Sequence, residues 1–282
     1  MKKMTFLLMV ALLLPSMASA WDRAYQPTHM GRVNFSRTTS IEALGWRTNF
    51  DGDLRIANPG AADFTLDFDS EGNFSDETRY GFRISHVLSE KSALKLSYMS
   101  LDNSGTFSKS AVFDFQGVTY DANATINMDV KKHWFDLTYM YNLNHGREAV
   151  GNRDAFYLDA LVGVKFNKAE VDVAGASGGV VAQSSWDESF PVPYIGLAAA
   201  SQVADNLWLK GQVKYININF SGNDAKHHDY SLNLAYRINS EINDTEWYVD
   251  VGYRGIKYDV ETDDDRAELS YCGPTFGVFA RF

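Results

Sequence analysis

The chain has 282 residues, with 36 acidic against 26 basic side chains, a formal net charge of −10 at pH 7 and one cysteine. This balance argues against nucleic acid as a partner, since phosphate contacts need a basic face, and a single cysteine excludes an internal disulfide or a cysteine-based metal cluster. Aromatic residues make up 14% of the chain and there are only 6 prolines, which favours many strands separated by turns.

The first predicted element is a signal peptide over residues 1–20. A basic start at Lys2 and Lys3 precedes a short apolar run, 6–14, and Ala18-Ser19-Ala20 is the A-x-A pattern that a signal peptidase recognises. The run is too short to cross a bilayer as a helix. We therefore predict that Ala18 and Ala20 are the small residues of the cleavage site and that the mature chain begins at Trp21.

Segments of alternating apolar and polar residues follow through the rest of the chain. In 130–143, for example, Phe135, Leu137 and Tyr139 share one face, whereas Asp136 and Thr138 share the other. Ten segments of this kind are predicted strands, and they lie near 41–56, 77–88, 93–106, 130–143, 154–166, 189–201, 206–220, 229–239, 246–259 and 268–282.

The connections between these segments help to choose among folds. Short connections such as 88–92 and 203–206 alternate with long ones such as 57–76 and 107–129, as the periplasmic turns and external loops of outer-membrane barrels do. The sequence therefore predicts an all-β chain forming a closed antiparallel transmembrane β-barrel of ten strands over 41–282. A periplasmic segment over 21–40 precedes it, and both chain ends are predicted to be periplasmic. An eight-stranded barrel and a secreted soluble sandwich are the alternatives.

The end of the chain carries a specific motif. Thr275, Gly277, Ala280 and Phe282 resemble the carboxy-terminal signal of outer-membrane barrels, which the assembly machinery recognises: a polar residue, a glycine two places on, and hydrophobic residues at the third-last and last positions. Ala280 is a weak hydrophobe for its place. The motif predicts that the barrel-assembly machinery and periplasmic chaperones are partners during biogenesis.

Three stretches resemble a family of small, mostly uncharacterised proteobacterial outer-membrane barrel proteins. They are Tyr98-Met99-Ser100-Leu101-Asp102-Asn103-Ser104-Gly105, then Phe115-Gln116-Gly117-Val118-Thr119-Tyr120, then Tyr271-Cys272-Gly273-Pro274 with the Arg281-Phe282 end. The resemblance covers most of the mature chain and implies a barrel in the bacterial outer membrane, surrounded by lipid and lipopolysaccharide. It implies no activity and no catalytic residue, and the OmpA and OmpW types share the architecture only.

Few residues are candidates for a catalytic or metal-binding site. His133 falls on the apolar face of its predicted strand, with Asp129 and Ser108 as possible neighbours, or it is an interfacial side chain. His227 and His228, beside Asp224 and Asp229, are predicted to form a solvated loop tip, because adjacent residues on a strand point to opposite faces and do not share one ligand sphere. The run Asp263-Asp264-Asp265 either binds a divalent cation or is solvated. No catalytic, cofactor or metal site is assigned, and the chain is expected not to be an enzyme.

Charges on the inward face are the most informative feature of the predicted barrel. The alternation predicts a lumen cluster of Arg47, Arg79, Arg83, Asp136, Asp159, Lys165, Arg237, Asp250 and Arg254, with Lys95, Lys210 and Lys214 on the same face. Inward charges must pair or meet water, because an isolated buried charge costs many kcal/mol. The expectation is a barrel without a wide pore and with a structural or loop-mediated binding role. The alternatives are a narrow anion-favouring channel and a hydrolase or lipid-modifying enzyme with its site at the rim.

Overall fold

The computed structural model describes residues 39–56, 64–71, 74, 76–89, 91–110, 112–115, 118–144, 156–220, 223–242, 245–261 and 265–282. Ten long strands form the barrel wall in this part of the chain, each paired antiparallel with the next. They are β1 (Thr39–Ile56), β3 (Glu77–Ser89), β4 (Ser92–Ser108), β7 (Thr125–Asn142), β8 (Phe156–Ser177), β9 (Val180–Ala204), β10 (Leu207–Phe220), β11 (Asn223–Ile242), β12 (Thr245–Glu261) and β13 (Arg266–Arg281).

Pairing of β13 with β1 closes the barrel, from Ser40 opposite Arg281 to Arg55 opposite Arg266. The prediction of a closed ten-stranded antiparallel barrel is therefore confirmed, and the eight-stranded alternative is wrong. Three short strands lie in the connections: β2 (Phe64–Asp67), β5 (Phe113–Phe115) and β6 (Val118–Tyr120). The signal-peptide residues Ala18, Ala20 and Trp21 lie outside the described residues. No helix in the described ranges is long and apolar enough to cross a membrane.

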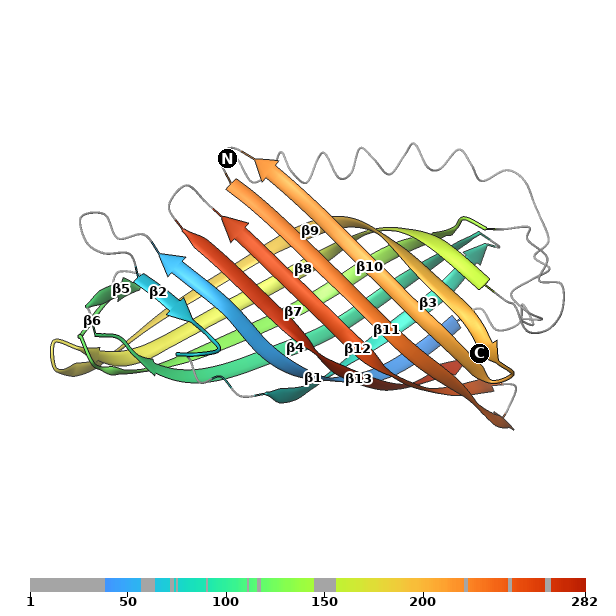
Figure 1. Cartoon of the computed structure of the whole chain (residues 1–282), viewed down its shortest axis with the longest axis horizontal. Coiled ribbons are helices and arrows are strands. Elements are labelled where there is room, and N and C mark those ends of the chain that lie inside the picture. Colours follow the sequence, from blue (N-terminus) through green and yellow to red (C-terminus); the bar gives the residue numbers. More distant parts are fainter. Residues whose placement is uncertain are drawn as a thin grey trace.

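The barrel has two distinct ends. Thr39 and Phe282 pair through their backbone N–H and C=O groups at 2.9 and 3.0 Å, and we call this the terminal end. The opposite end carries β2, β5, β6 and the tip of the β8–β9 hairpin, and we call it the loop end; it is at the left in Figure 1.

A belt of apolar side chains surrounds the wall from the terminal end to about its middle. On β11 the outward residues Tyr230, Leu232, Leu234, Tyr236 and Ile238 are between 40 and 58% exposed. This segment has the length of about 9–11 residues that a tilted transmembrane strand needs. Aromatic residues mark the edge of the belt that faces the loop end, as at a membrane interface: Tyr80, Tyr98, Phe135, Phe166, Tyr215, Tyr230 and Tyr253.

Above this belt the polarity of the two faces is reversed. On β7 the outward residues change from Leu137 and Phe135 to Lys131 and Asp129, while the inward residues change from Thr138 and Asp136 to Val130 and Met128. The alternation itself continues without a shift in register against β4 and β8. The strands therefore leave the apolar belt and continue as a wall that is polar outside and apolar inside, like a water-soluble sheet protein.

The wall also divides above the belt. β9 pairs with β10 only as far as Ile195 opposite Tyr215, although β9 continues along β8 to Val180 and β10 continues along β11 to Phe220. Likewise, β3 pairs with β4 only up to Gly81 opposite Met99. Two sheets result in the described part of the loop end: a first sheet of β4, β7, β8 and β9, and a second sheet of β10, β11, β12, β13, β1, β2 and the first residues of β3.

An apolar cluster fills the space between the two sheets. We call it the mouth cluster, and it contains Phe50, Leu66, Phe68, Leu101, Phe107, Phe113, Phe115, Tyr120, Ile126, Met128, Val130, Val173, Ile256, Tyr258 and Tyr271, each at most 9% exposed. The rings of Phe50 and Tyr271 stack with centroids 4.9 Å apart. The hydroxyl of Tyr120 donates to the Val173 carbonyl at 3.1 Å, which fixes the β5–β6 hairpin to β8. The loops that carry β2 and β5–β6 thus close the barrel with apolar side chains.

Candidate functional site

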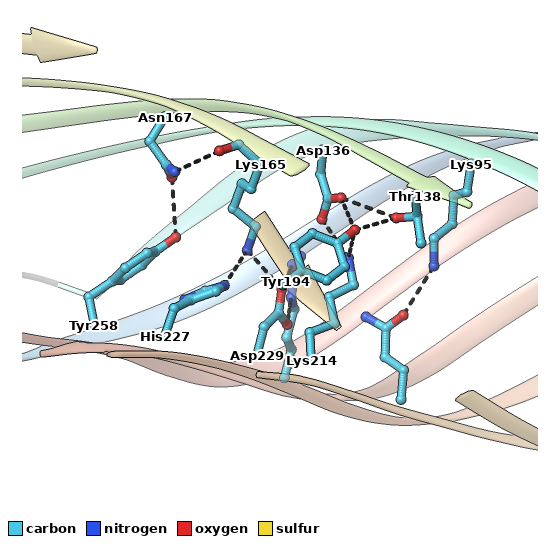
Figure 2. Close-up of polar contacts among 12 residues, drawn as sticks. Lys95, Asp136, Thr138, Lys165, Asn167, Tyr194, Lys214, His227, Asp229 and Tyr258 are labelled. Carbon is cyan, nitrogen blue, oxygen red and sulfur yellow. Dashed lines mark hydrogen bonds and ion pairs between the residues drawn. The ribbon is translucent and has the colours of Figure 1, made fainter. Parts of the chain in front are cut away.

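A layer of charged residues crosses the barrel interior just below the mouth cluster (Figure 2). It is built by inward positions of six neighbouring strands, β7 to β12. The five charged members, Asp136, Lys165, Lys214, Asp229 and Arg254, are each at most 7% exposed. Such charges are tolerated in a barrel only when they are paired, because taking each out of water is costly.

Asp229 on β11 is the centre of one half of this layer. It accepts hydrogen bonds from Lys165 Nζ at 2.9 Å and from Arg254 Nε and Nη2 at 3.0 and 2.8 Å. Arg254 on β12 therefore binds both carboxylate oxygens, and Lys165 on β8 binds Oδ2 as well. The guanidinium of Arg254 also lies 5.2 Å from the ring centroid of Trp46 and 5.7 Å from that of Trp134, so aromatic faces help to stabilise it.

Asp136 on β7 is the centre of the other half. Lys214 Nζ on β10 donates to it at 2.5 Å, the Tyr194 hydroxyl on β9 donates to it, and Thr138 Oγ1 donates at 3.1 Å. Lys214 also donates to the Tyr194 hydroxyl at 3.0 Å. These bonds join β7 and β10 across the place where the backbone pairing of β9 with β10 stops, so the charged layer holds the wall together at the foot of that opening.

His227 is buried inside the barrel. Lys165 Nζ lies 3.1 Å from its Nε2, and because an ammonium only donates, Nε2 accepts and the ring proton is on Nδ1. Its ring stacks on Tyr258 with centroids 4.4 Å apart. His228 points outward against Tyr215. The opposite facing of the two histidines was predicted, but the solvated loop tip was wrong for His227, because β11 begins at Asn223 and places His227 within the wall.

The other predicted lumen residues lie at different depths. Toward the terminal end, Arg83 pairs with Glu42 at 2.7 Å, Asp250 pairs with Lys210, and Asp159 accepts from Asn142 at 2.9 Å. Arg237 lies near that end, 3.6 Å from Glu246, whereas Arg79 pairs with Glu77 on β3.

Arg47 does not belong to the lumen cluster. Its side chain is 64% exposed and lies 3.9 Å from Asp76, on the face of β1 opposite Trp46 and Thr48. The prediction was wrong because it assumed an apolar outward face along the whole length of the strand. Arg47 lies above the belt, where the outward face is polar.

Sequence reasoning missed Asp229, Glu42 and Tyr194, which supply the partners of the predicted cations. Asp229 is in phase with Ser231 and Asn233 on the polar face of its strand, and this signal was present in the sequence. Tyr194 follows two prolines in a segment whose alternation is less clear.

His133 does not lie beside the two neighbours predicted for it, Asp129 and Ser108. It lies on the outer wall, and the Tyr98 hydroxyl is 3.2 Å from its Nδ1. Ser100 lies opposite it, whereas Asp129 pairs with Ser104 and Ser108 with Thr125, farther toward the loop end. Among the described residues no group of three His, Cys, Asp or Glu side chains is placed to hold a metal ion, and Asp263 and Asp264 lie outside them.

The carboxy-terminal motif lies on β13. Gly277 faces inward beside Glu42 and Ala43, and Phe282 is 47% exposed on the outer side of the closing pair. On the outer face, the ring of Phe276 covers Gly45 of β1, where a side chain would collide with it at 2.2 Å. Thr275 accepts a hydrogen bond from Asn233 at 3.1 Å. The motif thus forms the surface along which the two chain ends meet.

No model of a known protein family and no curated protein matches the chain. Among solved structures, the outer-membrane protease OmpT from Escherichia coli is similar with a TM-score of 0.55 at 12% identity, over 87% of this chain and 97% of that chain. The translocator domain of the autotransporter NalP from Neisseria meningitidis has a TM-score of 0.49 at 12% identity, over 100% and 97%. At such identities the likeness to OmpT shows the fold alone. The chain therefore has the fold of the outer-membrane β-barrels.

Proposed function

We propose that this chain is an outer-membrane barrel without an open pore, whose interior is a rigid support and whose loop end is its binding surface. One observation carries the proposal: the interior is filled by a charged layer, at most 7% exposed, directly beneath the mouth cluster. A water-filled passage would leave such side chains hydrated. A filled small barrel is instead stiffened by its own ion pairs.

The proposed location follows from the exterior. The apolar belt, the aromatic residues at its edge and the carboxy-terminal motif support insertion into the outer membrane, with both chain ends periplasmic and the loop end outside. Lipid and lipopolysaccharide are then partners around the belt, and the barrel-assembly machinery and periplasmic chaperones act during insertion. Deletion of Phe282 is expected to lower the amount of heat-modifiable protein in outer-membrane fractions, and an unchanged amount would contradict this proposal.

A narrow anion-favouring channel is the second candidate, because two inward lysines lack a carboxylate partner among the described residues. Lys95 donates to Gln212 Oε1 at 3.1 Å, and Lys132 Nζ lies 3.1 Å from the ring centroid of Tyr258. Both side chains are at most 8% exposed. Among the described residues the buried side chains carry more positive than negative charge, and a mobile anion would balance it.

Single-channel recording separates the two candidates. The purified full-length protein is inserted into planar bilayers, and folding is checked by its heat-modifiable mobility. A closed barrel gives no stable current steps. Stable steps with anion preference would overturn the closed-barrel proposal, and loss of that preference in Lys95→Gln and Lys132→Gln would support the channel.

We propose no enzymatic role. The support is that His227 is bound by Lys165 and His133 by Tyr98, so neither imidazole is paired with a nucleophile or a carboxylate in the described part of the chain. A third possibility, hydrolysis at the rim, would be revealed by turnover of a lipid or peptide ester that is lost in His133→Gln.

A further inference from the structure

A groove of about 400 Å³ lies on the outer wall of β4, β7, β8 and β9, at the edge of the apolar belt that faces the loop end. Tyr98, His133, Phe135, Phe166, Lys168 and Ser189 line it. Its floor is aromatic: the rings of Tyr98 and Phe135 lie 4.8 Å apart, and Phe135 and Phe166 are 49 and 51% exposed. The groove therefore extends the apolar surface of the belt toward the loop end, into the part of the wall whose outward face is polar.

Three rows of outward side chains cross these strands in order from the belt to the loop end. Because the register is continuous, each row can be read across the four strands. The first is apolar (Tyr98, Phe135, Phe166, Pro191), the second is polar and basic (Ser100, His133, Lys168, Ser189), and the third is mainly acidic (Asp102, Lys131, Glu170, Asp187).

This order of chemistry is the order of groups along a zwitterionic phospholipid, whose acyl chains are followed by a phosphate and then by an ammonium group. We propose that the groove binds one such lipid, with its acyl chains on Phe135 and Phe166, its phosphate at His133 and Lys168, and its ammonium group toward Glu170 and Asp187. The inference rests on the proposed membrane location of the belt. An anionic lipid satisfies the basic row but leaves the acidic row facing its negative headgroup.

The side chains that would hold the phosphate are available for it. Lys168 pairs with Glu170, but the two side chains are 52 and 30% exposed, and an exposed pair of this kind contributes little to stability. Lys168 can thus exchange this carboxylate for a phosphate at small cost, with its aliphatic stem along the apolar floor. In the tautomer in which His133 Nδ1 accepts from Tyr98, Nε2 carries the proton and donates to the same phosphate.

Native mass spectrometry of the full-length protein tests the proposal. The folded protein in detergent is offered equal amounts of phosphatidylethanolamine and phosphatidylglycerol with identical acyl chains, and the retained lipid is counted. We expect one retained phosphatidylethanolamine, preferred by about fivefold. Lys168→Gln lowers retention of both lipids, whereas Glu170→Gln removes the preference but keeps phosphatidylglycerol. Ser189→Phe, which fills the groove without changing charge, lowers retention of both.

The chain offers a closely matched control. Lys257 on β12 and Glu268 on β13 form an outward ion pair above the belt, with side chains 47 and 26% exposed, outside the groove. Lys257→Gln and Glu268→Gln should leave retention unchanged. Equal retention of the two lipids by the wild type, or an equal effect of the control variants, would overturn the proposal. If the protein conducts ions in planar bilayers but still retains phosphatidylethanolamine preferentially, the closed-barrel proposal is wrong and the lipid-binding proposal stands.

Discussion

The belt half and the loop-end half of the barrel are built from the same strands, but their polar and apolar faces are reversed. In the belt, apolar residues such as Leu234 face outward and ions such as Asp136 face inward, so the interior is held by ion pairs. At the loop end, Lys131 and Asp129 face outward and Met128 and Val130 face inward, so the interior is held by apolar contact. The solvent outside the wall, lipid or water, determines which arrangement is stable.

The two interiors also differ in what one substitution should do. Removing one partner from a buried ion network leaves an uncompensated charge, whereas trimming an apolar side chain leaves a cavity. The charged layer is therefore the part of the molecule most sensitive to changes of charge. An added charge on the outward face should destabilise the belt half strongly and the loop-end half very little.

The largest effect is expected for Asp229→Asn, which leaves Lys165 and Arg254 without their shared carboxylate. We expect a loss of about 3–5 kcal/mol in unfolding free energy, measured by urea titration in lipid vesicles. Asp114→Asn, at an exposed position of β5, is the control and should change little. The triple replacement Asp229→Leu, Lys165→Met, Arg254→Met should recover most of the loss, since it removes this carboxylate together with both of its cations and leaves the pair of Asp136 with Lys214 intact. A loss below about 1 kcal/mol for Asp229→Asn would contradict the ion-paired layer.

An added arginine tests the outward faces. Leu234 lies at the middle of the outward run on β11, so Leu234→Arg is expected to cost about 2–4 kcal/mol in the same titration. Leu137→Arg, one row from the belt edge, should cost less. Asn127→Arg, on the outward face of β7 above the belt, should stay within about 0.5 kcal/mol of the wild type, as surface substitutions do. Equal costs at Leu234 and Asn127 would show that the belt does not end where the aromatic row lies.

The smallest effect concerns the tip of the β8–β9 hairpin. Asp121 accepts hydrogen bonds from the backbone N–H groups of Gly178 and Gly179, each at 3.0 Å, and these donors lower the pKa of the Asp121 carboxyl below its ordinary value in an unfolded chain. Its contribution is therefore complete above that unfolded-state value and is lost as the pH falls through the lower folded-state value. We expect Asp121→Ala to speed amide exchange at Gly178 and Gly179 at neutral pH.

The same measurement at acid pH completes that test. Once the Asp121 carboxyl of the wild type is protonated, the wild type and Asp121→Ala should show the same amide exchange rates at Gly178 and Gly179, each expressed relative to the rate of an unstructured peptide. A difference that persists unchanged below the carboxyl pKa would mean that Asp121 does not hold the hairpin tip through its charge.

Alternation in the sequence was enough to predict the belt half, because there the rule of apolar outside and polar inside holds for strands such as β7 and β8. Above the belt the rule reverses, so Lys168, Glu170 and Asp172 resemble a solvated loop although they are the outward face of β8. The same reversal explains the error at Arg47. It also explains why 107–129 and 167–188 were expected to be loops, whereas much of both is strand.

Partners within the charged layer could not be read from the sequence. Which cations reach Asp229 depends on Arg254 of the neighbouring strand β12 and on Lys165, which extends across the lumen from β8 and lies more than 60 residues away along the chain. Alternation predicts on which face of the sheet a side chain lies. It predicts neither its depth in the barrel nor the side chains that it contacts across the lumen. The mouth cluster was missed for a related reason, since its members come from short strands in the connections and from both sheets.

Closure of the wall has a consequence for the order of folding. Phe50 lies near the start of the described chain and Tyr271 near its end, and their stacked rings belong to the cluster that covers the interior. This contact joins the first and last strands of the wall, so it closes a very long loop of chain, and we expect these rings to remain exposed to water during much of assembly. Contacts this distant in sequence are slow to form. The last step of folding should therefore be the closing of the loop end, and a chaperone that shields these aromatic rings would be needed longest.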